Sequence, residues 1–328
     1  MMDGGFIPSD ARSAFLERRR SGIGGSDIAA IVGLSKFKTP YDVWLSKSGL
    51  DEPEDEADKP WLYWGSILED VVAKEYALRG GGKVQRVNAQ LIHPEHHFAV
   101  ANIDRAVVNP QIAGRVWWKD GRLTTDRILE CKTANGFAAS AWGADGSDQI
   151  PEAYLCQVQW YMGITGAGFA DVAVLIGGSD YRSYTIEADA GLFADLLAEG
   201  EAFWRLVESG IAPDPQTVAD AQARWPQHLK AKSHIASGSA ARAVDELAEI
   251  KDQMAELKAR EEGLKLTIMA EMQDAEVLTD MSDPIATWKA QSADRIDAKK
   301  LRADHPEIAA LYTSTSSTRV LRLKSKKD

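Results

Sequence analysis

A β-rich run over residues 83–134, enclosed by two segments with helical periodicity, constrains the fold of this chain more than any other feature. The segment before it, GSILEDVVAKEYALRGGG, predicts a helix that three glycines end. The other predicted elements are strands at 83–93, 98–108, 114–118 and 127–133, a helix at 151–166, strands at 171–178 and 182–188, and a helix near 189–209. This order predicts an α/β domain in which helices flank a mixed central sheet.

The composition of the 328-residue chain changes after residue 211, where the segment IAPDPQ is typical of a linker. We therefore expect one domain over residues 1–215 and a C-terminal helical extension over residues 216–328. Apolar residues in this extension recur at intervals of three and four, at Leu247, Ile250, Met254, Leu257, Leu264 and Ile268. The spacing indicates a heptad seam and predicts a coiled-coil-like arm or a helical hairpin. The segments IATWKAQ and STRVLRLK predict two short terminal strands.

The formal net charge of −11 has the wrong sign for a protein that coats DNA nonspecifically. Basic residues nevertheless gather between positions 12 and 47, at Arg12, Arg18, Arg19, Arg20, Lys36, Lys38 and Lys47. Such a local basic track is compatible with a nuclease that encloses its substrate. Two cysteines are no basis for a disulfide framework, and the N-terminal residues lack the apolar core of a secretion signal. We therefore expect a cytoplasmic protein.

The motif LECKT places two opposite charges on one face of an otherwise apolar strand. Glu130 and Lys132 share this face because strand residues alternate, whereas Cys131 points the other way. Burying such a pair is costly unless it has a chemical purpose. The E-x-K motif by itself is common, and an edge strand whose polar face meets water explains it as well.

An upstream carboxylate favours the chemical interpretation. Asp104 ends the apolar run FAVANI, and the β-meander connects it to Glu130. Two carboxylates at the ends of paired strands suit Mg²⁺, which would polarise a scissile phosphate and activate a water that Lys132 orients. Asp120 and Asp126 are alternative acidic residues in the same meander, and the strand before Asp104 favours Asp104.

Two predicted helices carry further candidates. Glu69 lies beside an apolar helical stripe, where it is either a flanking surface residue or, with a metal nearby, a ligand or water-positioning group. Tyr154 and Gln157 share one face of the helix predicted at 151–166, and in isolation a role in the core is their default interpretation.

The segment RRRSGIGGSDIA places arginines before a glycine turn and a short predicted helix with Ser26 as its N-cap. The Ser26 hydroxyl, backbone N–H groups and Arg19 or Arg20 would together suit a phosphate group. A capped helix after a basic loop is an equally good interpretation of this segment alone.

Taken together, these motifs resemble the YqaJ-like viral recombinases, the lambda-type exonucleases of the PD-(D/E)xK nuclease superfamily. The matching segments occur in the family's order over about residues 12–180 and are RRRSGIGGSDIAAIVGLSKFKTPYDVW, GSILEDVVAKEY, HPEHHFAVANIDRAV, LECKT and IPEAYLCQVQWYMGITG. The GIGGSDIAAI segment and the Y-x-x-Q-V-Q helix are the specific ones. The resemblance implies a restriction-endonuclease-like core.

The resemblance also implies roles for the matched residues. Asp104, Glu130 and the Cys131 backbone carbonyl would hold Mg²⁺, for which Mn²⁺ substitutes, and Glu69 would assist at a second ion or the water. Lys132 would assist the attacking water, while Gln157 and Tyr154 would line the site. Arg19 and Ser26, with Arg20 as the alternative, would bind the terminal 5′-phosphate.

The function implied is degradation of one strand of double-stranded DNA from its 5′ end, with release of 5′-mononucleotides during phage-type homologous recombination in a bacterial host. A ring-shaped homotrimer and a single-strand annealing protein as partner are also implied. Alternatives are an endonuclease or single-strand nuclease of the same superfamily, and a catalytically inactive scaffold that binds DNA ends.

The chain departs from the family pattern at two points. Ile103 stands where the family usually has proline before its aspartate. The long interval between Asp104 and Glu130 implies an enlarged hairpin that contains Trp117 and Trp118. These tryptophans either stack on DNA or pack in the core, and we expect them to pack.

Overall fold

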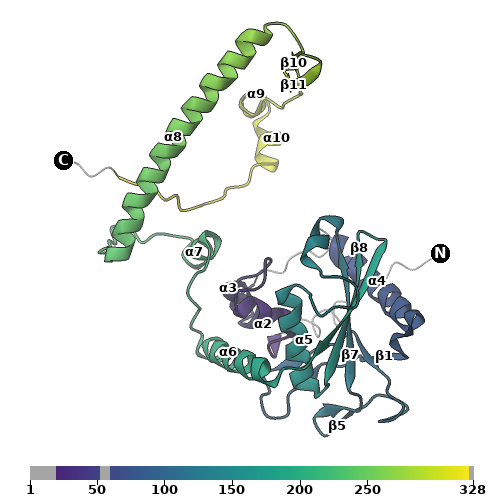
Figure 1. Ribbon diagram of the computed structural model, residues 1–328. Coiled ribbons are helices and arrows are strands. Elements are labelled where there is room, and N and C mark those ends of the chain that lie inside the picture. The colour runs from purple at the N-terminus through teal and green to yellow at the C-terminus, as the bar shows by residue number, and fades with distance from the viewer. Residues whose placement is uncertain (1–19, 52–59, 325–328) are drawn as a thin grey trace. The chain divides into compact units, whose positions relative to one another are not determined.

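The computed structural model describes residues 20–51 and 60–324. The chain forms two compact units, of which one ends at Arg224 and the other begins at Trp225. The first unit contains the mixed α/β fold that the order of elements predicted (Figure 1). No helix in the described part of the chain is long and apolar enough to cross a membrane.

The first unit is built on a five-stranded sheet with the strand order β1-β4-β7-β8-β9. The strands are β1 (Val84–Arg86), β4 (Arg105–Val107), β7 (Arg127–Ala134), β8 (Phe169–Ile176) and β9 (Asp180–Glu187). β7 and β8 are parallel, and the other neighbouring pairs are antiparallel. The crossover between the parallel strands is α5 (Glu152–Thr165), as such a connection requires. The expected mixed sheet is thus confirmed.

Helices cover both faces of this sheet (Figure 1). On one face α4 (Pro60–Tyr76) packs against Leu129 of β7 and Ala173 of β8. On the other face α5 packs against Ile128 and Val172, with α2 (Gly25–Ile31) and α6 (Ala190–Ser209) beside it. Adjacent residues of β7 thus belong to different cores, because successive side chains in a strand point to opposite faces.

The two N-terminal helices begin at different kinds of cap. α3 (Pro40–Lys47) has Thr39 as its N-cap, with Thr39 Oγ1 accepting from the N–H of Asp42 at 3.2 Å. The cap proposed at Ser26 is wrong, because Gly24 is the N-cap of α2. Asp27 Oδ2 accepts from the Gly24 N–H at 3.0 Å and thereby satisfies the start of the helix.

α4 begins at Pro60, five residues before the predicted start at Gly65. It continues into a π-helical turn, η2 (Ala77–Gly81), in which Gly80 has a φ of 95°. This left-handed residue ends the helix, as the run of three glycines indicated.

The interval between β4 and β7 contains the enlarged hairpin that the sequence implied. Its strands are β5 (Trp118–Lys119) and β6 (Arg122–Leu123). Packing in the core was the wrong expectation for these two tryptophans, because Trp117 is 57% exposed and Trp118 is 38% exposed. The remaining short strands of this unit, β2 (Leu91–Ile92) and β3 (Val100–Ala101), pair with each other.

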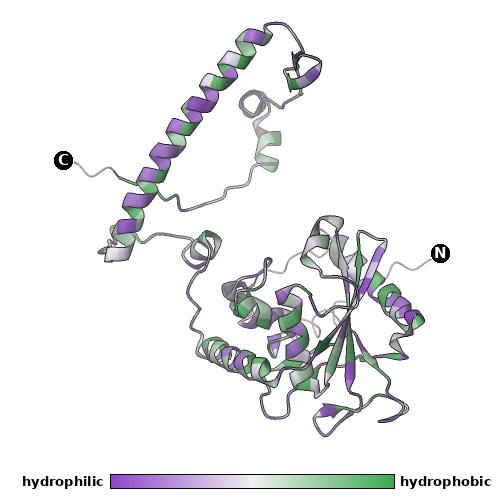
Figure 2. Ribbon diagram, in the orientation of Figure 1, coloured by the Kyte–Doolittle hydropathy of each residue, from purple (hydrophilic) through white to green (hydrophobic). Residues whose placement is uncertain are grey.

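The second unit is dominated by one helix, α8 (Gly238–Met272), of 35 residues. Hydrophobic and hydrophilic residues alternate along it (Figure 2), and the seam residues Ile250, Met254 and Leu257 are exposed. The other elements of this unit are β10 (Val277–Asp280), β11 (Asp283–Thr287), α9 (Ala298–Asp304) and α10 (Pro306–Leu311). Residues 285–287 of IATWKAQ belong to β11, but the described part of STRVLRLK forms no strand, so that expectation was wrong.

Candidate active site

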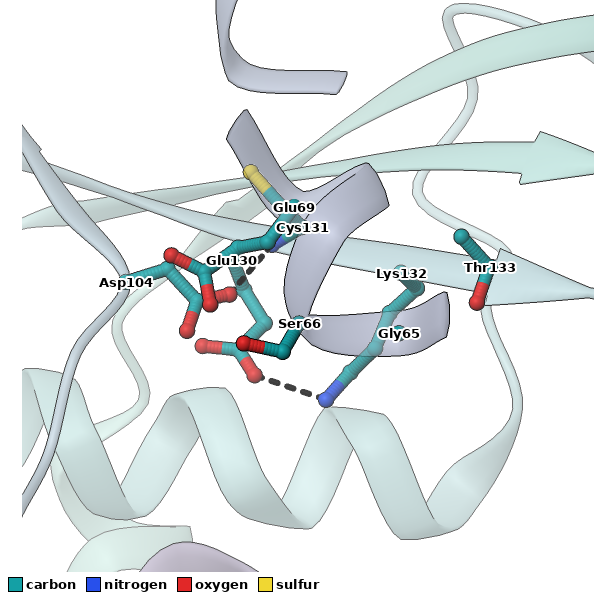
Figure 3. Close-up of a pocket in the computed structure, with 8 residues that line it drawn as sticks. All are labelled: Gly65, Ser66, Glu69, Asp104, Glu130, Cys131, Lys132 and Thr133. Atoms are coloured by element: carbon teal, nitrogen blue, oxygen red, sulfur yellow. Dashed lines mark hydrogen bonds and ion pairs between the residues drawn. The ribbon is translucent and has the colours of Figure 1, made fainter. Parts of the chain in front are cut away.

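A pocket of about 300 Å³ opens where α4 meets β7 (Figure 3). Its lining residues are Gly65, Ser66, Glu69, Asp104, Glu130, Cys131, Lys132 and Thr133. The pocket therefore contains five of the residues that the sequence singled out, drawn from three separate segments. The other two helical candidates, Gln157 and Tyr154, reach the same residues from α5.

Glu130 and Lys132 lie side by side on the face of β7 that meets α5. Lys132 Nζ donates to Glu130 Oε1 at 2.7 Å and to Gln157 Oε1 at 3.0 Å. Gln157 Nε2 in turn donates to Glu130 Oε1 at 2.8 Å. Gln157 thus uses both ends of its amide to hold the two charged side chains in place, which identifies the purpose of this polar residue on a largely buried helix.

Asp104 joins this group from the segment between β3 and β4. Its Oδ2 accepts a hydrogen bond from the backbone N–H of Cys131 at 2.8 Å. Burial, and then the nearby negative charge of Glu130, raise the pKa of Asp104 to about 8. A cation bound beside Asp104 and Glu130 would stabilise the ionised form of Asp104.

Glu130 supplies a second sign of a cation site. Its Oε2 is buried without a hydrogen-bond partner, and it is one of only three such side-chain atoms in the described part of the chain. A buried carboxylate oxygen is costly to leave unpaired, and binding a metal ion is one way to satisfy it. Asp104, Glu130 and a strand carbonyl such as that of Cys131 are all oxygen donors, which hard divalent cations prefer. These residues therefore fit the predicted ion.

The ammonium group of Lys132 lies on the same face, in a side chain that is 18% exposed. Burial opposes its charge, but Glu130 outweighs this effect, so that the pKa of Lys132 is raised and the group stays protonated. Nζ also lies 4.7 Å from the ring centroid of Tyr154, whose ring stacks on Trp142. Tyr154 therefore contacts the Lys132 ammonium through its ring face.

Glu69 lines the pocket, but its carboxylate is already engaged. Glu69 Oε1 accepts from Arg105 Nη1 at 2.5 Å and lies 3.6 Å from Arg86 Nη2. Among the residues that the structure describes, no three His, Cys, Asp or Glu side chains gather into a metal-binding group. Glu69 lines the same pocket as Asp104 and Glu130, but its carboxylate is paired with Arg105 and Arg86.

Arg105 is the residue of this site that the sequence did not reveal. Its side chain is only 5% exposed and bonds to Glu69 and Asp70, two consecutive residues of α4. Asp70 is the more exposed of the two partners, with 55% of its side chain accessible. An arginine directly before the apolar run AVV was the available signal, because a buried guanidinium requires acidic partners.

Of the three residues expected to bind a terminal phosphate, the structure describes Arg20 and Ser26. Arg19 lies outside the described residues. Arg20 forms a 3.0 Å ion pair with Asp51, and Ser26 is exposed one position inside α2. Lys47, counted in the basic track, is instead buried in a 2.6 Å ion pair with Asp27.

The alternative acidic residues of the meander lie elsewhere. Asp120 occupies the turn of the β5–β6 hairpin with a φ of 50°. Asp126 Oδ1 accepts a hydrogen bond from Asn109 at 3.0 Å. Neither of these two residues lines the pocket, whereas Asp104 does.

A mixed sheet that carries a Glu-x-Lys strand opposite a second carboxylate defines the class of PD-(D/E)xK nucleases. Comparison with known proteins then identifies the family: residues 14–168 match the YqaJ-like viral recombinase domain. The protein YqaJ of Bacillus subtilis (strain 168) is 36% identical over 306 residues, which cover 91% of this chain and 89% of that protein. The chain belongs to the YqaJ-like viral recombinase family. Membership confirms the family inferred from the sequence and, with it, the expected class of DNA exonuclease.

Solved structures show weaker similarity. An alkaline exonuclease from Laribacter hongkongensis is 18% identical, with a TM-score of 0.46 over 61% of this chain and 94% of that chain. A phage-related exonuclease from Haemophilus somnus 129PT is 13% identical, with a TM-score of 0.37 over 58% and 96% of the two chains.

Proposed function

We propose that this protein is a magnesium-dependent exonuclease that degrades one strand of double-stranded DNA in the 5′→3′ direction and releases 5′-mononucleotides. The observation that carries the proposal is the buried, unpaired Oε2 of Glu130 beside Asp104 and Lys132. This combination supports a site that binds a divalent cation and acts on a phosphodiester.

In the proposed mechanism Asp104, Glu130 and the backbone carbonyl of Cys131 hold the cation. When bound, Mg²⁺ polarises the scissile phosphate and lowers the pKa of the attacking water. Lys132 orients that water and stabilises the negative charge that develops on the phosphate. Because its ammonium is already held by Glu130 and Gln157, little reorganisation accompanies this step.

Two residues are proposed to support this chemistry from the edge of the pocket. Arg105 holds Glu69 at the pocket wall, where Glu69 positions the water or a second cation. Tyr154 shields the Lys132 ammonium from water on the α5 side. Mn²⁺ has the same preference for oxygen ligands and is proposed to replace Mg²⁺.

The polarity and the assembly are proposed from the resemblance in sequence. Arg19, Ser26 and Arg20 are proposed to bind the terminal 5′-phosphate, and exposed Ser26 is accessible for that contact. We further propose a ring-shaped homotrimer that acts with a single-strand annealing protein in phage-type recombination in the bacterial cytoplasm.

Timed digestion of linear duplex DNA with Mg²⁺ tests the function directly. Substrates labelled at either the 5′ or the 3′ end, and covalently closed circles of the same sequence, separate the alternatives. Early release of a 5′-labelled mononucleotide and resistance of the circles are expected. Cleavage of the circles would contradict exonuclease action, and early release of the 3′ label would contradict the polarity. Glu130→Gln serves as the inactive control, and Arg205→Gln, at an exposed ion pair on α6, as the active control.

A further inference from the structure

The hairpin between β4 and β7 has two chemically different faces. β5 and β6 are joined by Asp120 and Gly121, whose φ values of 50° and 75° are those of a tight hairpin turn. Trp118 pairs with Leu123, and Lys119 pairs with Arg122. Because side chains alternate along each strand, these two pairs point to opposite sides of the hairpin.

The inner side anchors the hairpin to the first unit. Val116 and Leu123 are 3% and 7% exposed and belong to the main hydrophobic core. Trp117 N–H donates to Thr124 Oγ1 at 2.8 Å, and Thr124 N–H donates to the Trp117 carbonyl at 2.9 Å, which extends the pairing by one step. The hairpin is therefore held in one orientation.

The outer side carries a basic and aromatic surface. Its members are Arg115, Trp117, Lys119 and Arg122, all of them exposed. The Arg115 guanidinium lies 4.6 Å from the centroid of the Trp117 ring. Within residues 20–51 and 60–324, no ion pair involves these three cations, and Asp120 at the turn is the one acidic residue between positions 115 and 124.

We propose that this outer surface of the hairpin, defined by Arg115, Trp117, Lys119 and Arg122, binds the phosphate backbone of the duplex DNA substrate. The three uncompensated cations match a polyanion, and the exposed indole offers a flat surface for the sugar and base edges. The chain as a whole has a net charge of −11, so this positively charged surface is a local exception and not part of a generally basic exterior. Naming DNA as the ligand rests on the proposed function.

The position of the hairpin limits where along the duplex it acts. Arg122 and Glu130 are separated by eight positions of continuous chain, which spans at most about 28 Å when extended. At a rise of about 3.4 Å per base pair, the contact lies within roughly eight base pairs of the cleavage site. The surface would thus hold the duplex close to the end that is being degraded.

Binding of a fluorescently labelled duplex, several helical turns long, tests the inference without nuclease chemistry if the assay contains EDTA. The triple variant Arg115→Gln, Lys119→Gln, Arg122→Gln should bind at least about tenfold more weakly at low salt. The slope of log affinity against log salt concentration should become shallower by about two to three. Trp117→Ala should weaken binding by about tenfold with a smaller change in slope.

A matched triple variant controls for the loss of three positive charges. Lys74→Gln, Arg79→Gln and Arg205→Gln remove exposed cations from helical surfaces, and two of these already pair with glutamates. This control should bind DNA almost as well as the unmodified protein. Equal affinity and equal salt slope in the two triple variants would overturn the inference, and so would a lack of duplex binding by the unmodified protein.

Two further measurements distinguish DNA binding by the hairpin from self-association and from the nuclease activity. Light scattering of the hairpin variant should give the mass of the unmodified protein. A lower mass, with DNA binding unchanged, would assign the surface to contact between copies of the chain and refute the proposal. Absence of digestion by the unmodified protein, with hairpin-dependent binding intact, would instead refute the nuclease function alone.

Discussion

The backbone N–H of Cys131 donates a 2.8 Å hydrogen bond to Oδ2 of Asp104, a residue 27 positions earlier in the chain. This bond draws the carboxylate at the start of β4 against the strand that carries Glu130. One carboxylate oxygen of Asp104 is thus paired with a backbone N–H, a donor that does not titrate. The geometry of the carboxylate pair thus depends on backbone pairing as well as on side chains.

Replacing either charged residue of β7 should abolish cleavage. Glu130→Gln removes the negative charge that balances Lys132, and Lys132→Ala removes the ammonium group proposed to orient the water. Each change is expected to lower kcat at least about a hundredfold. Digestion of end-labelled duplex measures the effect, and far-ultraviolet circular dichroism checks the fold. Near-normal turnover in either folded variant would refute the site.

The stability of the metal-free protein should depend on the protonation of Asp104. Its pKa is raised from 3.8 to about 8, chiefly by burial and then by Glu130. Between these two pH values the folded protein keeps the proton on Asp104, whereas the unfolded chain releases it. The protonated form therefore contributes its full stability to the folded protein below pH 3.8, and this contribution is lost as the pH rises through 8. Asp104→Asn cannot ionise and keeps its neutral form at every pH.

The Tm of Asp104→Asn, measured in EDTA, should therefore rise relative to that of the unmodified protein between pH 5 and pH 9. Asp195→Asn, at an exposed carboxylate of α6, is the control variant. A Tm difference that stayed constant for Asp104→Asn over this range would show that Asp104 ionises freely in the folded protein.

Cation binding should show the complementary pH dependence. Because the proton on Asp104 must leave before its carboxylate binds a metal ion, the affinity for Mn²⁺ should increase as the pH approaches 8. Isothermal titration calorimetry in buffers of different ionisation enthalpy measures both the affinity and the proton release. Proton release should disappear in Asp104→Asn, and its persistence there would assign it to another group.

Loss of Arg105 should destabilise the pocket wall. Its guanidinium is 5% exposed and bonds to Glu69 and Asp70, whose side chains are 22% and 55% exposed. Because these partners remain partly solvated, Arg105→Gln is expected to lower the free energy of unfolding by only about 1–3 kcal/mol. Urea denaturation measures the change. Arg79→Gln, at an exposed pair with Glu75, should leave the midpoint unchanged.

Removal of the second unit should preserve nuclease activity, and keeping α7 (Val218–Arg224) should preserve the stability of the first unit as well. Asp220 of this helix accepts a 3.0 Å hydrogen bond from Thr39 Oγ1, the capping residue of α3. Burial alone would raise the pKa of Asp220, but hydrogen bonds from the Gln216 backbone and from Thr217 outweigh this effect and lower the pKa. Asp220 therefore stays ionised as it accepts the hydrogen bond from Thr39.

A chain ending at residue 224 should thus digest linear duplex DNA at a rate close to that of the full chain. A chain ending at residue 215 should have a lower Tm because the Thr39 contact is lost. Loss of activity in a well-folded chain ending at 224 would show that the second unit contributes to the substrate channel or to the assembly.

The sequence alone determined those features that depend on local periodicity. Alternation along β7 put Glu130 and Lys132 on one face, and the spacing in α5 put Tyr154 beside Gln157. The pattern Thr-Pro at positions 39 and 40 is typical of a helix start, and α3 begins there because these residues act on their own backbone. Such signals can be read from a few neighbouring residues.

The tertiary structure alone decided which distant groups meet. No local pattern indicates that Arg105 reaches from β4 to two acidic residues of α4, or that Gln157 bridges Glu130 and Lys132. Local signals also misplaced the cap of α2, because Ser26 is a good capping residue by type, whereas the helix starts after Gly24 and Asp27 accepts from the Gly24 N–H. Long-range partners follow from how helices pack on the sheet, and that packing is a property of the whole core rather than of any one segment.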